Sequence, residues 1–201
     1  EKWVLKDVSF KVKPGETLAL VGATGAGKSS TINILSRFYE IQKGQILLDG
    51  VDIRDYELTF LRKNISTVLQ DVFLFSDTVK NNITLQNPNI TDEEIINAAK
   101  RVGAYDFIMR LPEGLDYKVQ ERGATLSAGQ AQLVSFIRAL VHDPRILILD
   151  EATSSIDTRT ERFIEKGMDE LMKGRTVFVI AHRLSTVRNA NAIIVLENGK
   201  I

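Results

Sequence analysis

The sequence predicts an α/β fold, in which a mostly parallel sheet carries an antiparallel β edge and a helical insertion. Apolar, β-branched runs recur towards the C-terminus, as is typical of parallel strands buried on both faces. A helical pattern separates two of these runs, and the middle of the chain changes to helical patterns. We therefore expect a single domain, 1–201, with lobes 1–75 and 143–201 forming the sheet core and 76–142 forming a helical subdomain.

The first part of the chain predicts strands around one glycine-rich loop. Residues 3–12 alternate as a strand, and Pro14–Gly15 makes the turn into a second, apolar strand. A glycine loop follows, with a helix from about Lys28. The stretch "GQILLDGVDI" predicts a hairpin that turns on Asp49–Gly50, and 64–70 predicts a further strand.

The remainder of the chain predicts helices first and strands later. Thr91 with Glu94, and Ser127 with Gln130, have the spacing of a capping box, which marks the start of a helix. The other expected elements are a short helix at 104–110, strands in "RILILD", "TVFVIAH" and "AIIVLENGKI", and a helix at 159–172.

Composition excludes several classes of protein. The 26 basic residues balance the 26 acidic ones, so the chain lacks the basic footprint of a nucleic-acid binder, and we expect no nucleic-acid partner. Without cysteine it has neither disulfides nor a thiolate metal site. No apolar run approaches the roughly 18 residues that span a bilayer. Both ends interrupt expected strands, so we expect a soluble piece of a longer protein.

The glycine loop matches a phosphate-binding motif. "GATGAGKS" has the pattern G-x-x-x-x-G-K-[ST], placed between an apolar strand and a helix. Backbone amides of such a loop surround phosphate oxygens, the lysine adds a positive charge, and the serine hydroxyl can bind Mg²⁺. The sequence therefore predicts a P-loop NTPase with a nucleoside triphosphate site. The expected phosphate-binding residues are Gly22, Ala23, Thr24, Gly25, Ala26, Gly27, Lys28, Ser29 and Ser30.

Polar residues follow three of the expected strands, at the sheet edge where parallel sheets bind ligands. Asp150 suits a carboxylate linked to Mg²⁺, and Glu151 is then placed to orient or deprotonate the attacking water. An acidic pair after a strand is by itself more often a helix cap. Together with the phosphate loop, however, the pair is better interpreted as part of the nucleotide site. Gln70 is a candidate contact for Mg²⁺ or the water, and His182 for the γ-phosphate.

The order of these motifs resembles the nucleotide-binding domain of ATP-binding cassette (ABC) transporters. The phosphate loop, Gln70, "LSAGQ", "ILILDEATSSID" and His182 follow one another as in that family, over nearly the whole chain. The resemblance implies a RecA-like core, ATP and Mg²⁺ as ligands, and a head-to-tail dimer. It also implies that Asp157 lies in the loop that crosses the dimer interface. The signature residues that would bind the γ-phosphate held by the other subunit are Leu126, Ser127, Ala128, Gly129 and Gln130.

Further stretches resemble the exporter branch of the family. These are "VLQDVFLFSDTVKNNITL" and "LPEGLDYKVQERGATLS", in which the acidic Glu121 is expected near the coupling helices of the membrane domain. The resemblance implies two partners, a second nucleotide-binding domain in a homodimer or heterodimer and the transmembrane domain of an exporter. It implies a place at the cytoplasmic face of the cell membrane, where ATP hydrolysis would power export of a drug, lipid or peptide.

The chain departs from the family at two places. The family normally has a basic residue after the signature glutamine, where this chain has Ala131, and Trp3 is too close to its strand to be the aromatic that stacks on adenine. Two other functions stay open at this stage. One is an ABC-type ATPase that acts on nucleic acid or ribosomes, and the other is a nucleotide-dependent interaction module with little turnover.

Overall fold

The computed structural model describes residues 3–120, 125–150, 158–181 and 184–201, which fold into two compact units. We call them the sheet unit and the helical unit. The sheet unit holds the described residues of 1–67, 144–151 and 174–201, and the helical unit holds those of 68–143 and 152–173.

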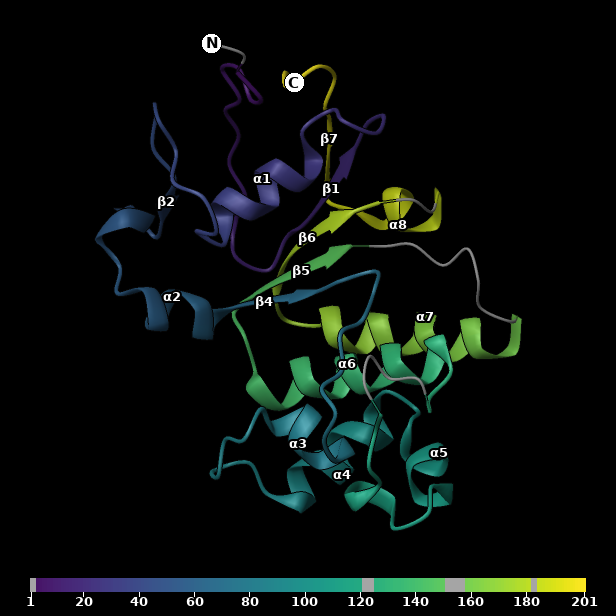
Figure 1. The fold of residues 1–201 in the computed structure, drawn as a ribbon. Coiled ribbons are helices and arrows are strands. Elements are labelled where there is room, and N and C mark those ends of the chain that lie inside the picture. The colour runs from purple at the N-terminus through teal and green to yellow at the C-terminus, as the bar shows by residue number, and fades with distance from the viewer. Residues whose placement is uncertain (1–2, 121–124, 151–157, 182–183) are drawn as a thin grey trace. The chain divides into compact units, whose positions relative to one another are not determined.

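The sheet unit contains a five-stranded sheet in the order β4-β5-β6-β1-β7 (Figure 1). β1 runs parallel to both β6 and β7, and β5 runs parallel to β6. The prediction of an α/β fold with a mostly parallel sheet is thereby confirmed. The strands are β1 (Thr17–Val21), β4 (Ile65–Val68), β5 (Ile146–Asp150), β6 (Thr176–Ile180) and β7 (Ala192–Val195).

The expected antiparallel strands form a small hairpin, which is a two-stranded sheet separate from the five-stranded one. β2 (Leu47–Leu48) pairs with β3 (Val51–Asp52) across a turn at Asp49 and Gly50. Both turn residues have positive φ, +51° and +84°, which is the backbone that two-residue hairpin turns require. The helices of the sheet unit are α1 (Lys28–Leu35), η1 (Ile53–Asp55), α2 (Leu58–Asn64) and α8 (Leu184–Asn189).

Alternate side chains of the parallel strands form the core of the sheet unit. Leu20, Ile148 and Ile180 belong to one apolar cluster, which also includes Ile32 of α1. The intervening side chains are buried too, as at Leu147, so these strands are apolar on both faces. This double burial explains why their sequences are continuous apolar runs and not alternating ones.

The expected strand at 3–12 is absent from the structure. The side chains of Val8 and Val12 do pack against the core, which accounts for the alternating pattern. Asp7, however, has a left-handed backbone with φ +52°, and this interrupts the extended conformation that a strand needs. At the other end of the chain, β7 stops at Val195 and a turn follows it, closed by a bridge between Glu197 and Lys200.

The helical unit contains the expected helices. Both capping boxes are present, Thr91 with Glu94 before α4 and Ser127 with Gln130 before α6, so both predicted helix starts are confirmed. Its elements are α3 (Val79–Thr84), α4 (Asp92–Arg101), α5 (Tyr105–Arg110), η2 (Gly114–Asp116), α6 (Ala128–His142) and α7 (Thr158–Met172).

α7 belongs to the helical unit, whereas the sequence placed it with the sheet lobes. It lies beside α6 (Figure 1) and buries Ile164 and Leu171 on one face. Gly167 lies on the same face, and a β-carbon there would come within 3.0 Å of the Phe136 ring of α6. Close packing of α7 on α6 through a glycine explains why α7 belongs to the helical unit. The sequence does not reveal this, because α7 lies between two strands of the sheet unit along the chain.

Candidate nucleotide-binding site

The loop between β1 and α1 depends on two glycines. A β-carbon on Gly22 would lie 2.2 Å from the carbonyl oxygen of Leu196, so no other residue fits there without moving backbone. Gly27 is the N-cap of α1, with φ +111° and no side-chain hydrogen bond to the first turn. The first amides of α1 are therefore not capped by a side chain, which leaves them suited to an anionic ligand.

Lys28 lies at the first position of α1 and turns back over the loop. Its ammonium donates to the carbonyl oxygens of Gly22 at 2.5 Å and Ala23 at 3.0 Å, and the residue is 9% exposed. Ser29, the next residue, is exposed. The loop thus combines a positive charge, uncapped amides and a hydroxyl, which together match the needs of a phosphate chain.

The turn after β7 braces the loop, and sequence reasoning missed this contact. The amide of Gly199 donates to the carbonyl of Ala26 at 3.0 Å, and the Gly199 carbonyl accepts from the amide of Lys6 at 2.7 Å. Asn198 and Gly199 both have positive φ, so the dipeptide Asn-Gly was the signal for a tight turn at this place. The turn ties the N-terminal segment and the loop together.

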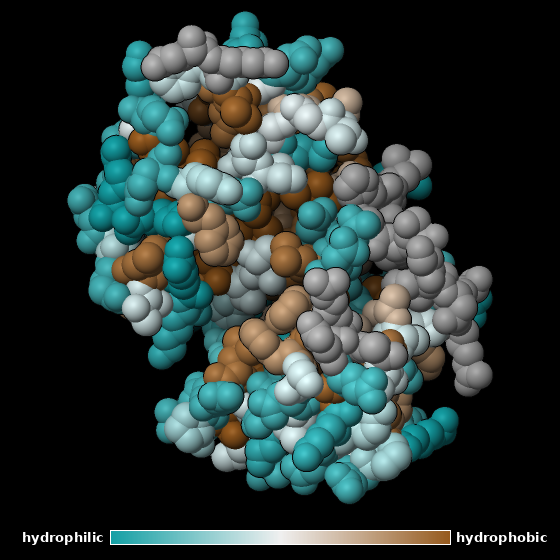
Figure 2. Space-filling view, in the orientation of Figure 1, coloured by the Kyte–Doolittle hydropathy of each residue, from teal (hydrophilic) through white to brown (hydrophobic). Residues whose placement is uncertain are grey.

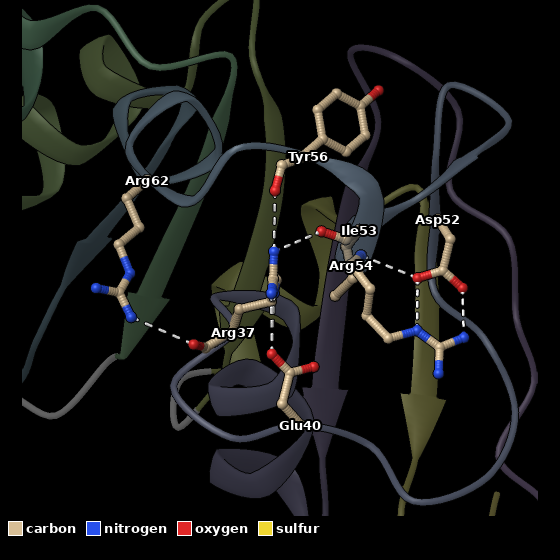
Figure 3. A network of polar contacts seen from close by, with 7 residues as sticks. All are labelled: Arg37, Glu40, Asp52, Ile53, Arg54, Tyr56 and Arg62. Atoms are coloured by element: carbon tan, nitrogen blue, oxygen red, sulfur yellow. Dashed lines mark hydrogen bonds and ion pairs between the residues drawn. The ribbon is translucent and has the colours of Figure 1, made fainter.

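Arg37 anchors the far end of α1 (Figure 3). It follows the helix with a left-handed backbone of φ +50°, and its guanidinium donates to the carbonyls of Ile53 at 3.0 Å and Tyr56 at 3.1 Å. The same guanidinium pairs with Glu40 at 3.0 Å. The helix that carries the phosphate loop is therefore fixed at its start by the loop and at its end by this network.

The pair of Asp52 and Arg54 lies beside this network. Arg54 donates to Asp52 through Nε at 2.9 Å and Nη2 at 2.6 Å (Figure 3). This hydrogen-bonded guanidinium lowers the pKa of Asp52 to about 2. The carboxylate therefore stays charged throughout the physiological range, and it also caps η1 by accepting from the Arg54 amide.

Asp150 ends β5 at the edge of the sheet where the loop begins. It is in register with Ile180 of β6, which in turn is level with Leu20 of β1. Two strand spacings separate β5 from β1, which is about 10 Å between their backbones. The structure thus brings Asp150 and the loop residues to one edge of the sheet unit, as the sequence predicted.

The other described candidates belong to the helical unit. Gln70 lies two residues beyond β4 and is exposed. Ser127 is the N-cap of α6: its hydroxyl accepts from the Gln130 amide at 3.2 Å, and the Gln130 side chain accepts from the Ser127 amide at 2.9 Å. Four further candidates lie outside the described residues: Glu121, Glu151, Asp157 and His182.

A family model described as "ABC transporter" matches residues 5–154. The chain belongs to the ABC transporter family. The ATP-binding domains of this family are ATPases, so the expected enzyme class is confirmed. The family explains why a phosphate loop and an acidic strand end occur together at one sheet edge.

Two relatives from Bacillus subtilis show the similarity to exporters. This ABC domain is 52% identical over 198 residues to the putative multidrug export ATP-binding/permease protein YgaD, covering 98% of this chain and 34% of that protein. It is 54% identical over 198 residues to the probable multidrug resistance ABC transporter ATP-binding/permease protein YheH, covering 98% of this chain and 29% of that protein. The predicted resemblance to exporter ATPase domains is confirmed.

A solved structure has the same fold. It is described as a bacterial Atm1-family ABC exporter with ATP bound, and it matches 98% of this chain and 35% of its own with a TM-score of 0.89 and 44% identity. The ABC domain thus spans about a third of the length of these relatives. Among the described helices, none is both long and apolar enough to cross a membrane.

The described residues of this ABC domain suit Mg-ATP. A β-carbon would obstruct the loop at Gly22, and α1 begins without a side-chain cap, so the loop has the shape and the donors for a phosphate chain. Mg²⁺ usually binds through one or two carboxylates together with substrate phosphates. Asp150 and the Ser29 hydroxyl are ligands of that kind, and a larger carboxylate cluster is unnecessary.

Proposed function

We propose that residues 1–201 form one ABC ATPase domain that binds and hydrolyses Mg-ATP in a head-to-tail pair and thereby powers export. The observation that carries this proposal is the set of groups that the sheet unit brings together at the carboxyl ends of its strands. There the uncapped start of α1 and Lys28, whose ammonium turns back over the loop, follow β1, and the carboxylate of Asp150 ends β5, with only β6 between the two strands. Phosphoryl transfer requires mainly positioning and neutralisation of charge, and this set of groups supplies both.

The loop would hold the phosphates of ATP. Amides of Gly22–Ser30 would donate to phosphate oxygens, and Lys28 would exchange its bonds with two loop carbonyls for bonds with the β- and γ-phosphates. Ser29, Asp150 and Gln70 would hold Mg²⁺, which supplies charge neutralisation on the phosphates when bound.

Three residues would act on the attacking water and the γ-phosphate. Glu151 would accept a proton from the water, Gln70 would orient that water, and His182 would donate a hydrogen bond to the γ-phosphate. Each follows a strand in the sequence, so each is expected at the ligand-binding edge of a parallel sheet.

The signature motif would complete the site of a second nucleotide-binding domain. Ser127 and Gly129, within the stretch Leu126–Gln130, would bind the γ-phosphate held by the partner, and Asp157 would lie at the same interface. The start of α6 supports this role because a helix N-terminus favours negative charge. The exposed Ser127 hydroxyl is able to change its hydrogen-bond partner as the pair closes.

A transmembrane exporter domain would be the other partner, at the cytoplasmic face of the cell membrane. Glu121 would lie near that partner's coupling helices. The helical unit supports a protein contact because Phe73 and Phe75 are 54% and 52% exposed and pack edge to face, with ring centroids 5.0 Å apart. Apolar groups stand among hydrophilic ones on the face seen in Figure 2.

The variant Glu151→Gln tests the proposed chemistry. Loss of a general base is expected to lower the hydrolysis rate by roughly a hundredfold to ten-thousandfold, while ATP still binds. Steady-state phosphate release and equilibrium ATP binding measure the two effects. Glu93→Gln, an exposed acid in the first turn of α4, is the matched control and should keep the parent rate. Hydrolysis by Glu151→Gln at the parent rate would overturn the assignment.

Ala131 favours a second candidate function, an interaction module that binds ATP with little turnover. It is half-buried in the first turn of α6, at the position where the resemblance to the family implies a basic residue. Under this alternative the parent protein binds ATP without hydrolysing it at any concentration. Ala131→Arg would then restore turnover if the missing cation is the cause.

A further inference from the structure

The buried side chain of Asn82 makes several hydrogen bonds to the chain segment that follows Gln70. Residues 71–78 have no regular secondary structure, so their backbone groups need other partners. The Asn82 side-chain oxygen accepts from the Phe75 amide at 2.8 Å, and its nitrogen donates to the carbonyls of Phe75 and Thr78, each at 3.0 Å. Asn82 is fully buried, and it fastens the segment onto α3.

Arg138 of α6 contacts both this segment, near its start, and α3. Its Nε donates to the carbonyl of Asn82 at 2.7 Å, and Nη1 and Nη2 approach the carbonyl of Phe73 at 3.5 and 3.4 Å. The Asn82 carbonyl lies in the last turn of α3, where carbonyls lack partners within the helix. The guanidinium therefore caps α3 and at the same time holds the start of the segment.

The same helix begins at the signature motif. Arg138 is eleven residues after the N-cap Ser127, which is about 16 Å along an α-helix. A continuous helix transmits displacement over that length because its backbone bonds are all internal. One guanidinium thus connects the segment after Gln70 with the helix that presents Ser127.

We propose that Arg138 is a positioning residue that makes the segment after Gln70 and the start of α6 move as one body. This inference rests on the proposed function, since Gln70 and Ser127 matter for turnover only if they contact the nucleotide. In a closing pair, movement of α6 would reach Gln70 through this link. The hydrogen bonds of the Arg138 guanidinium are with the carbonyls of Asn82 and Phe73.

The link requires an arginine and not merely a cation. A guanidinium has donors in a rigid fork and spans two separate carbonyls, whereas an ammonium is a point charge on a flexible stem. Burial lowers the pKa of Arg138, yet an arginine remains charged in a protein. Lysine at this position would keep the charge and lose the bridge.

The variants Arg138→Met and Arg138→Lys in the full chain test the proposal. Both are expected to lower kcat roughly tenfold or more through misplacement of Gln70, with ATP affinity changed less than about twofold. The matched control is Arg101→Met in the same unit, which removes an exposed ion pair with Glu170 and should keep the parent kcat. Full activity of Arg138→Lys would overturn the bridge. The proposal would also be overturned if the loss of kcat were no larger than the fraction of unfolded protein that thermal denaturation measures.

A double variant shows whether Arg138 acts through Gln70. If it does, Gln70→Ala with Arg138→Met is no slower than Gln70→Ala alone, because the second change removes a link to a group already lost. If the kcat loss of the double variant equals the product of the two single losses, Gln70 and Arg138 act independently and the proposal is overturned.

Hydrogen exchange tests the link without any turnover. Arg138→Met should speed exchange of the Phe75 and Asn82 amides while the amides of α4 keep their parent rates. Unchanged exchange at 73–85 would contradict the link. If the parent protein fails to hydrolyse ATP, or hydrolyses it with Glu151→Gln at the same rate, the proposed function fails, and the exchange result still decides whether Arg138 makes the link.

Discussion

Two helices begin at the motifs expected to bind phosphate, and they begin in different ways. α1 starts after Gly27, a left-handed residue that offers no side chain to the first amides. α6 starts after Ser127, whose hydroxyl and amide exchange hydrogen bonds with Gln130 in a complete capping box. The first helix therefore begins without a side-chain acceptor for its first amides, whereas in the second the Gln130 amide already has one.

This difference separates binding from turnover. At α1 a bound phosphate would supply the hydrogen-bond acceptor that a capping side chain supplies in other helices. We therefore expect the sheet unit to bind ATP by itself. At α6 a phosphate would have to replace or share the hydrogen bond that the Gln130 amide already makes, and under the proposed function the helix would contribute only when a partner presents its nucleotide. Changes at α1 should therefore abolish ATP binding, whereas changes at α6 should spare binding and reduce hydrolysis.

The largest effect is expected from Gly22→Ala. The new β-carbon would lie 2.2 Å from the Leu196 carbonyl oxygen, and the loop must shift. Each lost hydrogen bond to a charged phosphate costs about 1.5–3 kcal/mol, so with one or two lost we expect ATP affinity to fall roughly tenfold to a hundredfold or more. Titration of the parent and variant with ATP measures it. Gly44→Ala is the control, since its φ of +87° is also positive but no atom lies within 4 Å of the added carbon. Equal loss in both variants would contradict the clash.

An intermediate effect is expected from Ser127→Ala, with Thr91→Ala as its match. Each change removes the side-chain half of a capping box in the helical unit, and each should lower the free energy of unfolding by about 1 kcal/mol. Only Ser127→Ala should also reduce kcat, because α4 has no proposed contact with nucleotide. Equal kcat values for the two variants would remove the distinction between the two boxes.

The smallest effect is a difference in pH dependence between the two boxes. Hydrogen bonds from the backbone and side chain of Thr91 lower the pKa of Glu94 below its usual 4.5. The stability it contributes is present above pH 4.5 and is lost as the pH falls through the lowered pKa, whereas Gln130 does not titrate. Glu94→Gln should flatten the decline in unfolding free energy below pH 4.5, measured by denaturant titration. An unchanged decline would show that this box makes no acid-labile contribution.

Local signals in the sequence predicted most of the sheet unit and of the loop. Continuous apolar runs gave the parallel strands, the Asp49–Gly50 pair gave the hairpin, and the phosphate motif placed Lys28 at the start of a helix, because each signal depends on neighbours along the chain. Asp150 reached the expected edge because a parallel sheet aligns its strand ends.

Contacts between distant segments were beyond such signals. The brace from Gly199 to Ala26 and the link from Arg138 to Phe73 join residues far apart in the sequence, and single arginine or glycine residues give no periodic pattern. The prediction of a strand at 3–12 was wrong for a related reason. Asp7 adopts a positive φ, and the alternation of side chains in the sequence does not reveal it.

The most direct test of the account mixes two inactive chains. Lys28→Ala removes the lysine of the phosphate loop, and Ser127→Arg blocks the signature, so each variant alone should lose ATPase activity. In a head-to-tail pair of the two, one site combines the intact loop of one chain with the intact signature of the other. Random pairing of equal amounts should restore about a quarter of the parent rate per chain. A mixture that stays as inactive as its components would contradict the claim that α6 completes the partner's site.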